Sequence, residues 1–262
     1  MEEIRLNKWL SQLGVCSRRE ADRLIESGKV TVDDKIAQMG QKVSKAQKII
    51  CGGKLVWEPG GSDVPPSRQP EPVWLVVNKP KGIVCTTSPK DRAKTIVELV
   101  SCPERVYPVG RLDKDSRGLI LMTNQGDLVN KMMRSGNAHE KESEVQVDRP
   151  VTGRFLEAVA GGVELAGLNQ RTRPCWVEAM GEKGFRIILT QGLNRQIRRM
   201  CQAFGYQVLD LKRTRIMNIR LGSLGEGKFR QMAEDEYREL LRLLEESGSS
   251  NLPYAQRTLS GG

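Results

Sequence analysis

A stretch rich in proline and glycine divides this chain of 262 residues into two parts. Residues 59–70 contain four prolines and two glycines without a periodic apolar pattern, which is the composition of a linker. We assign the linker to residues 59–71. Residues 1–58 then form a small domain, and residues 72–247 are long enough to bury a core of their own. The Ser/Gly-rich tail at 248–262 is predicted to be disordered.

The apolar residues and cysteines exclude several classes of protein. No run approaches the roughly 18 apolar residues that cross a bilayer, and the first residues lack the order of a signal peptide, so the cytoplasm is expected. Six cysteines are scattered without a Cys-x-x-Cys pair, which argues against a disulfide framework and against a metal site. The single histidine, His139, excludes a mechanism that needs two, and it is expected at the surface or in a hydrogen bond.

The positive charge of the chain is concentrated in one segment. The formal net charge is +10. Between residues 186 and 220, one acid, Asp210, stands against eight basic side chains, which are Arg186, Arg195, Arg198, Arg199, Lys212, Arg213, Arg215 and Arg220. Such a field suits a polyanion, and nucleic acid is favoured over a membrane surface because the apolar positions here are needed for a core.

Residues 194–205 carry the sharpest helical pattern in the chain. The apolar positions Ile197, Met200, Cys201 and Phe204 repeat at helical spacing, and Arg195, Arg198, Arg199 and Gln202 repeat it on the opposite side. Asn194 is predicted to cap this helix and Gly205 to end it. The basic face is either solvated or directed at an acidic partner, and the absence of interleaved acids favours the partner.

Asp113 lies in a polar run between two glycines. Gly110 and Gly118 bracket residues 111–117, and residues 119–123 read as a short buried strand. Asp113 is therefore expected on a loop that enters a sheet. A carboxylate beside arginines is common at protein surfaces, so the spacing alone does not make it catalytic.

The remaining second part is rich in strands. We expect strands at 73–77, 83–87, 144–147, around 177, and at 185–189 and 216–221, with helices at 128–133, around 155–160 and in the region of Tyr237 to Leu244. The turn at 78–82 is predicted to present Lys79 and Lys81. This order lacks regular βαβ repetition and indicates an α+β fold.

The first part reads as two short helices followed by strands. Leu6, Trp9, Leu10 and Leu13 form one apolar stripe, and the Ser17-Arg-Arg-Glu20 run fits a capping box for a second helix. Hairpin residues 30–36 and a strand region at 48–57 follow. The helix start at Arg18, Arg19 and Arg23 favours phosphate, because its backbone amides are free.

Residues 4–56 resemble the S4 RNA-binding domain. The motifs Arg-Leu-Asn-Lys-Trp-Leu from Arg5 and Cys-Ser-Arg-Arg-Glu-Ala-Asp from Cys16 carry the match. The resemblance implies RNA contacts from Arg5, Lys8, Arg18, Arg19 and Arg23.

From residue 73 to about 245, the chain resembles the RsuA/RluB/RluF group of ribosomal RNA pseudouridine synthases. The motifs are Asn78-Lys-Pro-Lys-Gly-Ile-Val, Gly110-Arg-Leu-Asp-Lys-Asp-Ser-Arg-Gly-Leu, Leu121-Met-Thr-Asn-Gln-Gly-Asp-Leu and Gln191-Gly-Leu-Asn-Arg-Gln-Ile-Arg-Arg-Met. The RluF type in this group also carries an S4 domain in front. The implied catalytic fold is a mixed, mostly antiparallel sheet with flanking helices.

The same resemblance implies the site. Asp113 would be the nucleophile that helps detach uracil from ribose, with Arg198 as the partner that keeps a buried carboxylate ionised. Arg111 would fill the space left by the flipped base. Candidate phosphate contacts are Lys79, Lys81, Arg195 and Arg199. No cofactor is implied, and the expected partner of a monomeric protein is a stem-loop of ribosomal RNA, with 23S rRNA favoured and tRNA as a second candidate.

Ser143 departs from the family pattern, which implies a tyrosine at this position that packs on uracil. A serine cannot stack on a base, and its hydroxyl is a weaker acid than a phenol. The enzyme is then impaired or inactive, or another group such as Tyr107 or a water compensates, or the serine was introduced to trap an RNA complex. A competing function is a ribosome-associated RNA-binding factor without turnover.

Overall fold

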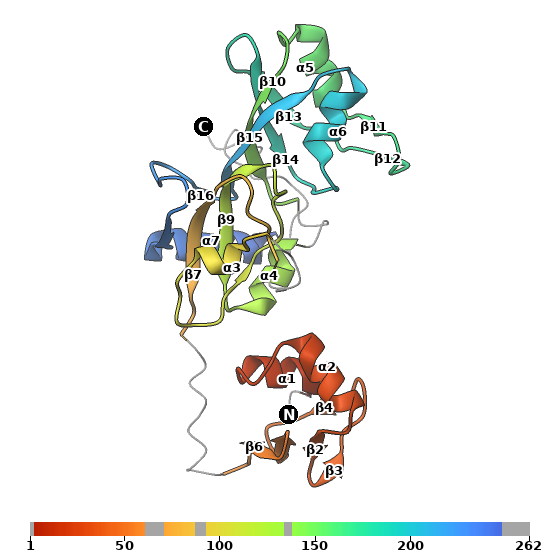
Figure 1. The fold of residues 1–262 in the computed structure, drawn as a ribbon, viewed down its shortest axis with the longest axis vertical. Helices are drawn as coiled ribbons and strands as arrows, with labels where there is room; N and C mark the ends of the chain where they lie inside the picture. The colour runs from red at the N-terminus through yellow and green to blue at the C-terminus, as the bar shows by residue number, and fades with distance from the viewer. Residues whose placement is uncertain (1–2, 61–70, 87–92, 134–137, 248–262) are drawn as a thin grey trace. The chain divides into compact units, whose positions relative to one another are not determined.

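The computed structural model describes residues 3–60, 71–86, 93–133 and 138–247. The chain divides into two compact units, Met1–Glu71 and Pro72–Gly262 (Figure 1). Most of the predicted linker, the tail from residue 248, and Thr87 of the expected strand at 83–87 lie outside the described residues. None of the helices in the described ranges is long and apolar enough to cross a membrane.

The first unit builds one small core from two helices and short strands. Helices α1 (Leu6–Gln12) and α2 (Arg18–Glu26) accompany a four-stranded sheet in the order β3-β2-β5-β6. The strand bounds are Val30–Val32 (β2), Lys35–Ile36 (β3), Ile49–Cys51 (β5) and Lys54–Trp57 (β6), and β1 (Ile4–Arg5) pairs with β4 (Lys42–Val43). The predicted stripe is confirmed, because Leu6, Trp9 and Leu10 are buried in this core.

The local signals in the first unit are confirmed in most respects. Asp33 and Asp34 both adopt positive φ in the tight turn between β2 and β3, which short polar side chains tolerate well. Ser17 accepts a hydrogen bond from the Glu20 amide at 3.1 Å, as predicted. The Glu20 carboxylate, however, lies 3.4 Å from Arg23. The serine half of the expected capping box is therefore present, and Glu20 pairs along the helix instead.

The second unit is organised on a nine-stranded sheet in the order β13-β14-β10-β15-β9-β7-β17, with β8 paired to β9 and β16 paired to β15. The strands are β7 (Trp74–Lys79), β8 (Tyr107–Pro108), β9 (Arg117–Thr123), β10 (Lys141–Val147), β13 (Trp176–Ala179), β14 (Gly184–Leu189), β15 (Val208–Ile216), β16 (Ile219–Arg220) and β17 (Phe229–Gln231). Among the described pairings of this sheet, β9 with β15 is the one parallel pair. The expected mixed, mostly antiparallel sheet is confirmed.

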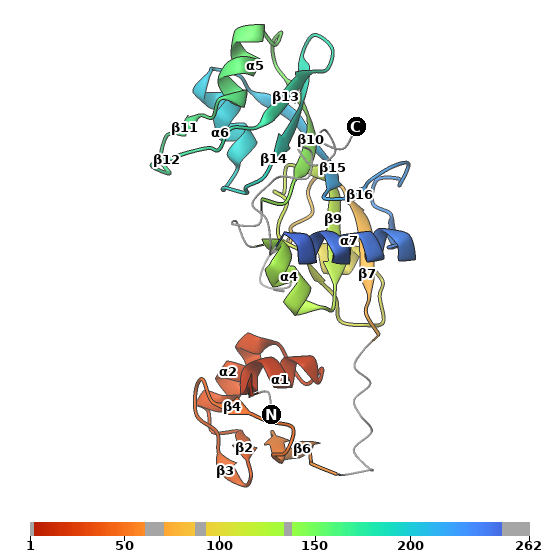
Figure 2. The same ribbon diagram turned by 180° about the vertical axis from the view of Figure 1, so that it is seen from behind.

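Strands β7 and β9 are buried on both faces, which explains their continuous apolar sequences. One face packs with helices α4 (Gly126–Met133) and α7 (Glu234–Glu246) through Trp74, Val76, Leu119 and Leu121. The other face packs with α3 (Ile96–Leu99) through Leu75, Val77, Ile120 and Met122. Figures 1 and 2 show α3 and α7 on opposite sides of these strands.

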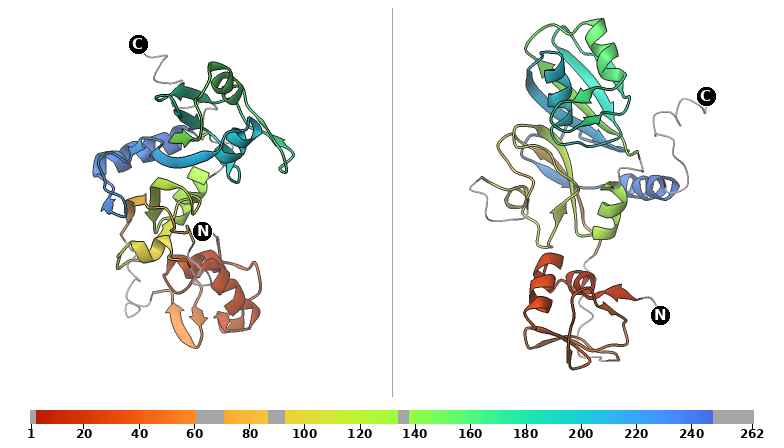
Figure 3. Two further views of the ribbon diagram at one scale, coloured as in Figure 1. Left: turned by 45° about the horizontal axis from the view of Figure 1, so that its top comes forward. Right: turned by 90° about the vertical axis from the view of Figure 1, so that its right-hand side faces the viewer.

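A second core lies at the other end of the sheet, where α5 (Gly153–Ala160) and α6 (Gln196–Ala203) cover β10, β14 and β15 (Figure 3). Phe155 of α5 and Phe185 of β14 meet edge to face at 5.6 Å. Met200 and Cys201, on the predicted apolar side of α6, are buried here, whereas Phe204 is 41% exposed. A hairpin of β11 (Glu164–Leu165) and β12 (Gln170–Arg171) completes this end.

Three local predictions in the second unit are wrong. Residues 83–86 form a single bridge, between Val84 and Thr95, in place of a strand. Asn194 does not cap α6, because Arg195 takes the cap position with left-handed φ of 50° and the Gln196 side chain accepts from the Leu193 amide. The stretch expected as one strand at 216–221 contains only the last residue of β15, a turn and the two residues of β16, whereas most of the long strand β15 (Val208–Ile216) was not predicted. The charged residues of β15 obscure the apolar pattern by which its buried face could have been predicted.

Candidate active site

A pocket opens beside Asp113 in the second unit. Its lining comes from the loop before β9, from β10 and β15, and from the segment that leads from β14 into α6. The residues on it are Arg111, Leu112, Asp113, Ser116, Lys141, Ser143, Leu189, Gln191, Gly192, Leu193, Arg195, Gln196, Ile197, Arg198, Leu211 and Arg213. The structure thus brings together Arg111, Asp113, Ser143, Arg195 and Arg198 of the predicted site.

Asp113 lines this pocket and keeps a carboxylate that is partly exposed to solvent. Its side chain is 36% exposed, and its Oδ2 lies 3.8 Å from Nη1 of Arg195. The Ser116 amide donates to the Asp113 carbonyl at 3.1 Å, which tightens the loop just before β9. Asp113 is therefore held on a turn that enters the sheet, as its glycine-flanked sequence predicts.

The expected ion pair between Arg198 and Asp113 does not form. Arg198 Nε lies 3.3 Å from Oδ2 of Asp115, and Nη2 donates to the Asp115 carbonyl at 2.9 Å. Arg195 also donates to Asp115, at 2.8 Å, and this hydrogen bond is the largest cause of the lowered pKa of Asp115. The basic face of α6 is thus directed at an acid of the Asp113 loop, and the arginine nearest Asp113 is Arg195.

The two lysines of the turn at 78–82 are not alike. Lys79 has no exposed surface, and its Nζ donates to the carbonyls of Pro80 and Ile83 at 3.0 and 2.9 Å. Burial is the main cause of its lowered pKa. The prediction that Lys79 contacts phosphate does not fit this placement. Lys81 is exposed, with Nζ 2.6 Å from Asp210.

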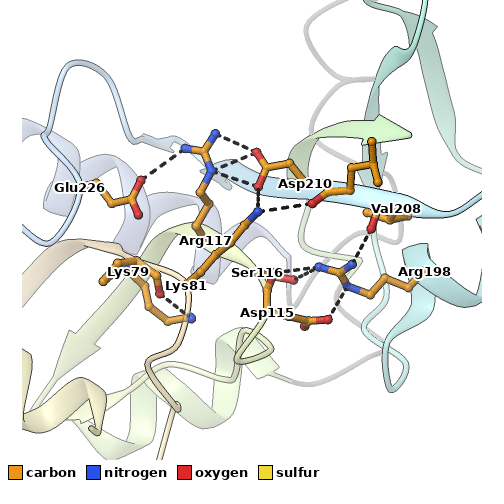
Figure 4. A network of polar contacts seen from close by, with 11 residues as sticks. Lys79, Lys81, Asp115, Ser116, Arg117, Arg198, Val208, Asp210 and Glu226 are labelled. Atoms are coloured by element: carbon orange, nitrogen blue, oxygen red, sulfur yellow. Dashed lines mark hydrogen bonds and ion pairs between the residues drawn. The ribbon is translucent and has the colours of Figure 1, made fainter. Parts of the chain in front are cut away.

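Figure 4 shows how the Lys81 contact continues into the sheet. Asp210 of β15 also accepts hydrogen bonds from Arg117 at the start of β9, the shortest at 2.8 Å. Burial alone would raise the pKa of Asp210, but the hydrogen bonds from Arg117 and Lys81 outweigh it and lower that pKa. These contacts fix the strand that follows the Asp113 loop.

The other predicted RNA contacts of the second unit differ in how far their side chains are already engaged within the protein. Arg111 is exposed, which suits a side chain that moves into a base stack. Arg195 is 42% exposed but already pairs with the loop acids. Arg199 donates to the carbonyls of Asn194 and Ala166, at 3.1 and 3.3 Å, so it braces α6 against its neighbours.

The predicted RNA contacts of the first unit are Arg5, Lys8, Arg18, Arg19 and Arg23. Arg19 and Arg23 lie on the exposed side of α2. Within the described ranges, Arg18 and Arg19 have no hydrogen bond or ion pair of their side chains. These two arginines stand at the first positions of α2, where the backbone amides are also unpaired by the helix. The arrangement is suited to phosphate, as the sequence predicts.

Ser143 occupies the pocket face of β10 and is buried. Its register partners are Ile187 on β14 and Arg213 on β15. Because the Ser143 side chain is short, the large polar side chain next to it on the neighbouring strand is that of Arg213. Tyr107, proposed as a substitute for the missing phenol, donates to the Asn124 carbonyl at 2.9 Å and does not line the pocket.

Sequence reasoning missed Arg213 and Lys141 as site residues. Arg213 is 7% exposed and Lys141 is half-buried, and both line the pocket. Burial lowers the pKa of Arg213 to about 10. It also lowers the pKa of Lys141 to about 8, with Arg213 as the second cause. The pocket wall therefore holds two cations beside the arginines that the sequence predicted, and burial is the largest cause of the lowered pKa of each.

A β-bulge decides which arginines of β15 face the pocket. On β10, Glu142 and Ser143 are consecutive, but their partners on β15 are Arg215 and Arg213, so Thr214 is the extra residue. Paired residues point to the same side of a sheet, which places Arg213 with Ser143 and Arg215 with Glu142 on opposite faces. Simple alternation along β15 would have put both arginines on one face.

Two further expectations concern His139 and metals. His139 is 7% exposed rather than at the surface, but the alternative expectation of a hydrogen bond is confirmed, because its ring bonds with the Lys131 backbone. Burial lowers its pKa. No group of three or more His, Cys, Asp or Glu side chains in the described part of the chain could hold a metal ion.

Comparison with known proteins decides the family. A family model described as RNA pseudouridylate synthase matches residues 73–203, and an S4 domain model matches residues 4–49. The chain belongs to the RNA pseudouridylate synthase family. The resemblance to the RsuA/RluB/RluF group and to the S4 domain is confirmed.

Relatives of this synthase cover nearly its whole length. The dual-specificity RNA pseudouridine synthase RluF of Escherichia coli O6:H1 is 47% identical over 97% of this chain and 83% of that protein. Ribosomal large subunit pseudouridine synthase B of Bacillus subtilis is 31% identical over 91% of this chain and 96% of its own length. A crystal structure of a pseudouridylate synthase, 27% identical, covers 90% of this chain and 99% of its own with a TM-score of 0.64.

Proposed function

We propose that this synthase isomerises a specific uridine to pseudouridine in a structured stem-loop of 23S rRNA, with Asp113 as the nucleophile. The proposal rests on one observation: the partly exposed carboxylate of Asp113 lines a pocket whose wall also holds the cations Arg195, Lys141 and Arg213. The exposed part of this carboxylate suits a base that arrives from solvent.

The chemistry follows from the charge that develops on the sugar. Breaking the bond between C1′ and N1 builds oxocarbenium character, which a carboxylate stabilises by its charge or by covalent attack. Asp113 either adds to C1′ or removes a 2′ proton to give a glycal. The same ring then rejoins ribose through C5, so the reaction needs no external group acceptor.

Three arginines support that step. Arg111, exposed beside Asp113, enters the stack when the target base is flipped out. Arg195 lies next to the Asp113 carboxylate, with Nη1 3.8 Å from Oδ2, and orients it toward the pocket. Arg198 acts as a positioning residue, because it holds the loop through Asp115 and Ser116 rather than touching Asp113.

The finer parts of the proposal concern the substrate and the setting. The name of the RluF relative describes dual specificity, which makes tRNA a second substrate to test beside 23S rRNA. Arg18 and Arg19 of the first unit supply phosphate contacts, with Lys81 as a further contact when RNA displaces Asp210. We place the protein in the cytoplasm as a monomer.

The test measures tritium release from 23S rRNA transcripts that carry 5-tritiated uridine. The chain as it stands should release tritium, and Asp113→Ala should reduce the rate by at least about 1,000-fold. The Asp113 side chain is partly exposed to solvent, so unfolding is not expected to explain this reduction, and circular dichroism checks it. Full release by Asp113→Ala would disprove the nucleophile assignment.

Ser143 favours a second candidate function, an RNA-binding factor without turnover. The residue is buried in the pocket where the family pattern has an aromatic ring. If the parent releases no tritium but Ser143→Tyr does, the catalytic apparatus is intact and lacks only the ring. Tight binding of the transcript with no release from either chain supports the binding factor and contradicts the enzyme.

A further inference from the structure

Arg213 has an unusual environment for a buried arginine. Its Nε donates to the Leu119 carbonyl at 2.7 Å, and Nη1 lies 3.4 Å from the Arg111 carbonyl. Nη2 is buried without a hydrogen-bond partner in the part of the chain that the structure describes. An unpaired buried donor costs free energy, and a charged one costs more than a neutral one. A ligand oxygen in the pocket would recover that cost.

The charge of Arg213 is also uncompensated by any direct ion pair among the described residues. The guanidinium of Arg213 and the ammonium of Lys141 belong to the same pocket wall. The charge of Arg213 is the second cause, after burial, of the lowered pKa of Lys141. Asp113 acts on Arg213 only through space. Two like charges held beside a pocket indicate a site for negative charge.

The reaction places such a charge in the pocket. When the bond from C1′ to N1 breaks, both electrons stay with N1, and the uracil anion spreads its charge to O2 and O4. The ring turns, C5 supplies the electron pair of the new bond to C1′, C5 loses its proton to solvent, and N1 gains a proton from water. The uracil leaves as an anion whether Asp113 adds to C1′ or removes a 2′ proton.

We propose that Arg213 binds a carbonyl oxygen of the flipped uracil through Nη2 and stabilises the uracil anion while the base is detached from ribose. This role rests on the proposed function. It gives the pocket a group that holds the free base during rotation, which matters here because Ser143, the register partner of Arg213, cannot stack on the ring. Lys141 adds positive charge from the same wall.

Nη2 reaches the base after a small movement of the loop at 111–116. This nitrogen has almost no exposed area, and the pocket beside it is lined by Arg111, Leu112, Asp113 and Ser116 of that loop. Entry of Arg111 into the RNA stack already requires that loop to move, and the Arg111 carbonyl is the weaker of the two partners of Arg213. The loop movement that accompanies base flipping therefore also gives the flipped base access to Nη2 of Arg213.

The experiment compares single-turnover rates on two 23S rRNA transcripts, one with uridine and one with 5-fluorouridine, scored after nuclease digestion as loss of the N1-linked nucleoside by liquid chromatography with mass detection. C5 of 5-fluorouridine has no proton to lose, so its C5-linked product keeps the fluorine and takes up water at C6. Fluorine withdraws electrons and makes uracil a better leaving group. Arg213→Gln should slow the uridine reaction by about 100-fold, as removal of one preorganised donor does. It should slow conversion of 5-fluorouridine at least about fivefold less, because that anion needs less stabilisation. Arg213→Lys should fall between the parent and Arg213→Gln.

Arg238→Gln is the matched control for charge, because Arg238 is exposed on α7 with only a surface pair to Glu234. It should match the parent on both transcripts. Equal reductions for the two bases in Arg213→Gln would show that Arg213 only props the loop, and an unchanged rate would exclude any role; either result overturns the proposal. If neither the parent nor Ser143→Tyr reacts, the proposed function fails, and the role of Arg213 fails with it.

Discussion

Arg213 and Arg215 are separated by one residue of β15 and are 7% and 5% exposed, but their partners are opposite in kind. Arg215 lies 3.0 Å from the carboxylates of both Glu140 and Glu142 and donates to the Met217 carbonyl at 2.8 Å. Arg213 has carbonyl partners and an unpaired nitrogen. A buried arginine whose charge is neutralised by its own chain stabilises the fold, whereas one left without a carboxylate is available to a ligand.

The largest stability effect should come from breaking the Arg215 network. Arg215→Met removes the cation that Glu140 and Glu142 share, which should lower the free energy of unfolding by about 3–5 kcal/mol because both carboxylates are largely buried. Urea denaturation at pH 7 measures it. Arg213→Met strands no ion-paired carboxylate and should cost clearly less. Adding Glu140→Gln and Glu142→Gln to Arg215→Met should recover most of the stability; no recovery would mean that packing, not charge, holds Arg215 in place.

A smaller destabilisation is expected where β9 crosses Arg213. Gly118 has φ of +103°, and a Cβ there would lie 2.3 Å from the Arg213 carbonyl oxygen. Gly118→Ala should therefore cost about 2–3 kcal/mol of stability and also slow the reaction, because the backbone of Arg213 must shift. Gly205, with φ of +75° and nothing within 4 Å, is the control for φ strain alone. If thermal melting shows equal destabilisation for Gly118→Ala and Gly205→Ala, the close approach does not matter.

Replacing Lys141 tests how much stability the buried positive charge of this side chain costs. Its pKa is lowered to about 8 in the folded state, below the ordinary value of 10.5, so the unfolded chain binds more protons between these values. Stability should therefore rise with pH from about 8 to 10.5, and the buried charge should cost stability below pH 8. Lys141→Met should be more stable than the parent at pH 7 by about 1–2 kcal/mol and should not show this rise. A parallel pH curve for the variant would exclude Lys141 as its source.

The exposed arginines of the first unit should give the smallest effect per residue. Arg18→Gln with Arg19→Gln should weaken binding of a 23S rRNA transcript and lower the magnitude of the slope of log affinity against log salt by about 0.7–0.9 for each phosphate that is no longer neutralised. Fluorescence anisotropy at several salt concentrations measures this. Lys35→Gln, on β3, controls for net charge, and an equal change in slope would remove the special role of α2.

Most elements with a single buried face were predictable from the sequence. Ile197, Met200 and Cys201 identified α6 by their helical spacing. The continuous apolar run at 119–123 identified β9 for a different reason, because that strand is buried on both faces. The family and its fold followed from motifs around Asp113 and Arg198. β15 was largely missed, since its basic residues were counted as a surface field. Whether Arg213 or Arg215 faces the pocket depends on the bulge at Thr214, which only pairing with β10 defines.

Two of the apolar cores of the second unit share one strand. Leu211 of β15 packs in the core with α5 and α6, and Ile216 of the same strand packs in the core with α7. Neither core can unfold while β15 keeps its place, so we expect the second unit to lose structure in one cooperative transition. Amide hydrogens of β15 should then exchange with solvent only through that global opening, and hence more slowly than those of β11 and β12.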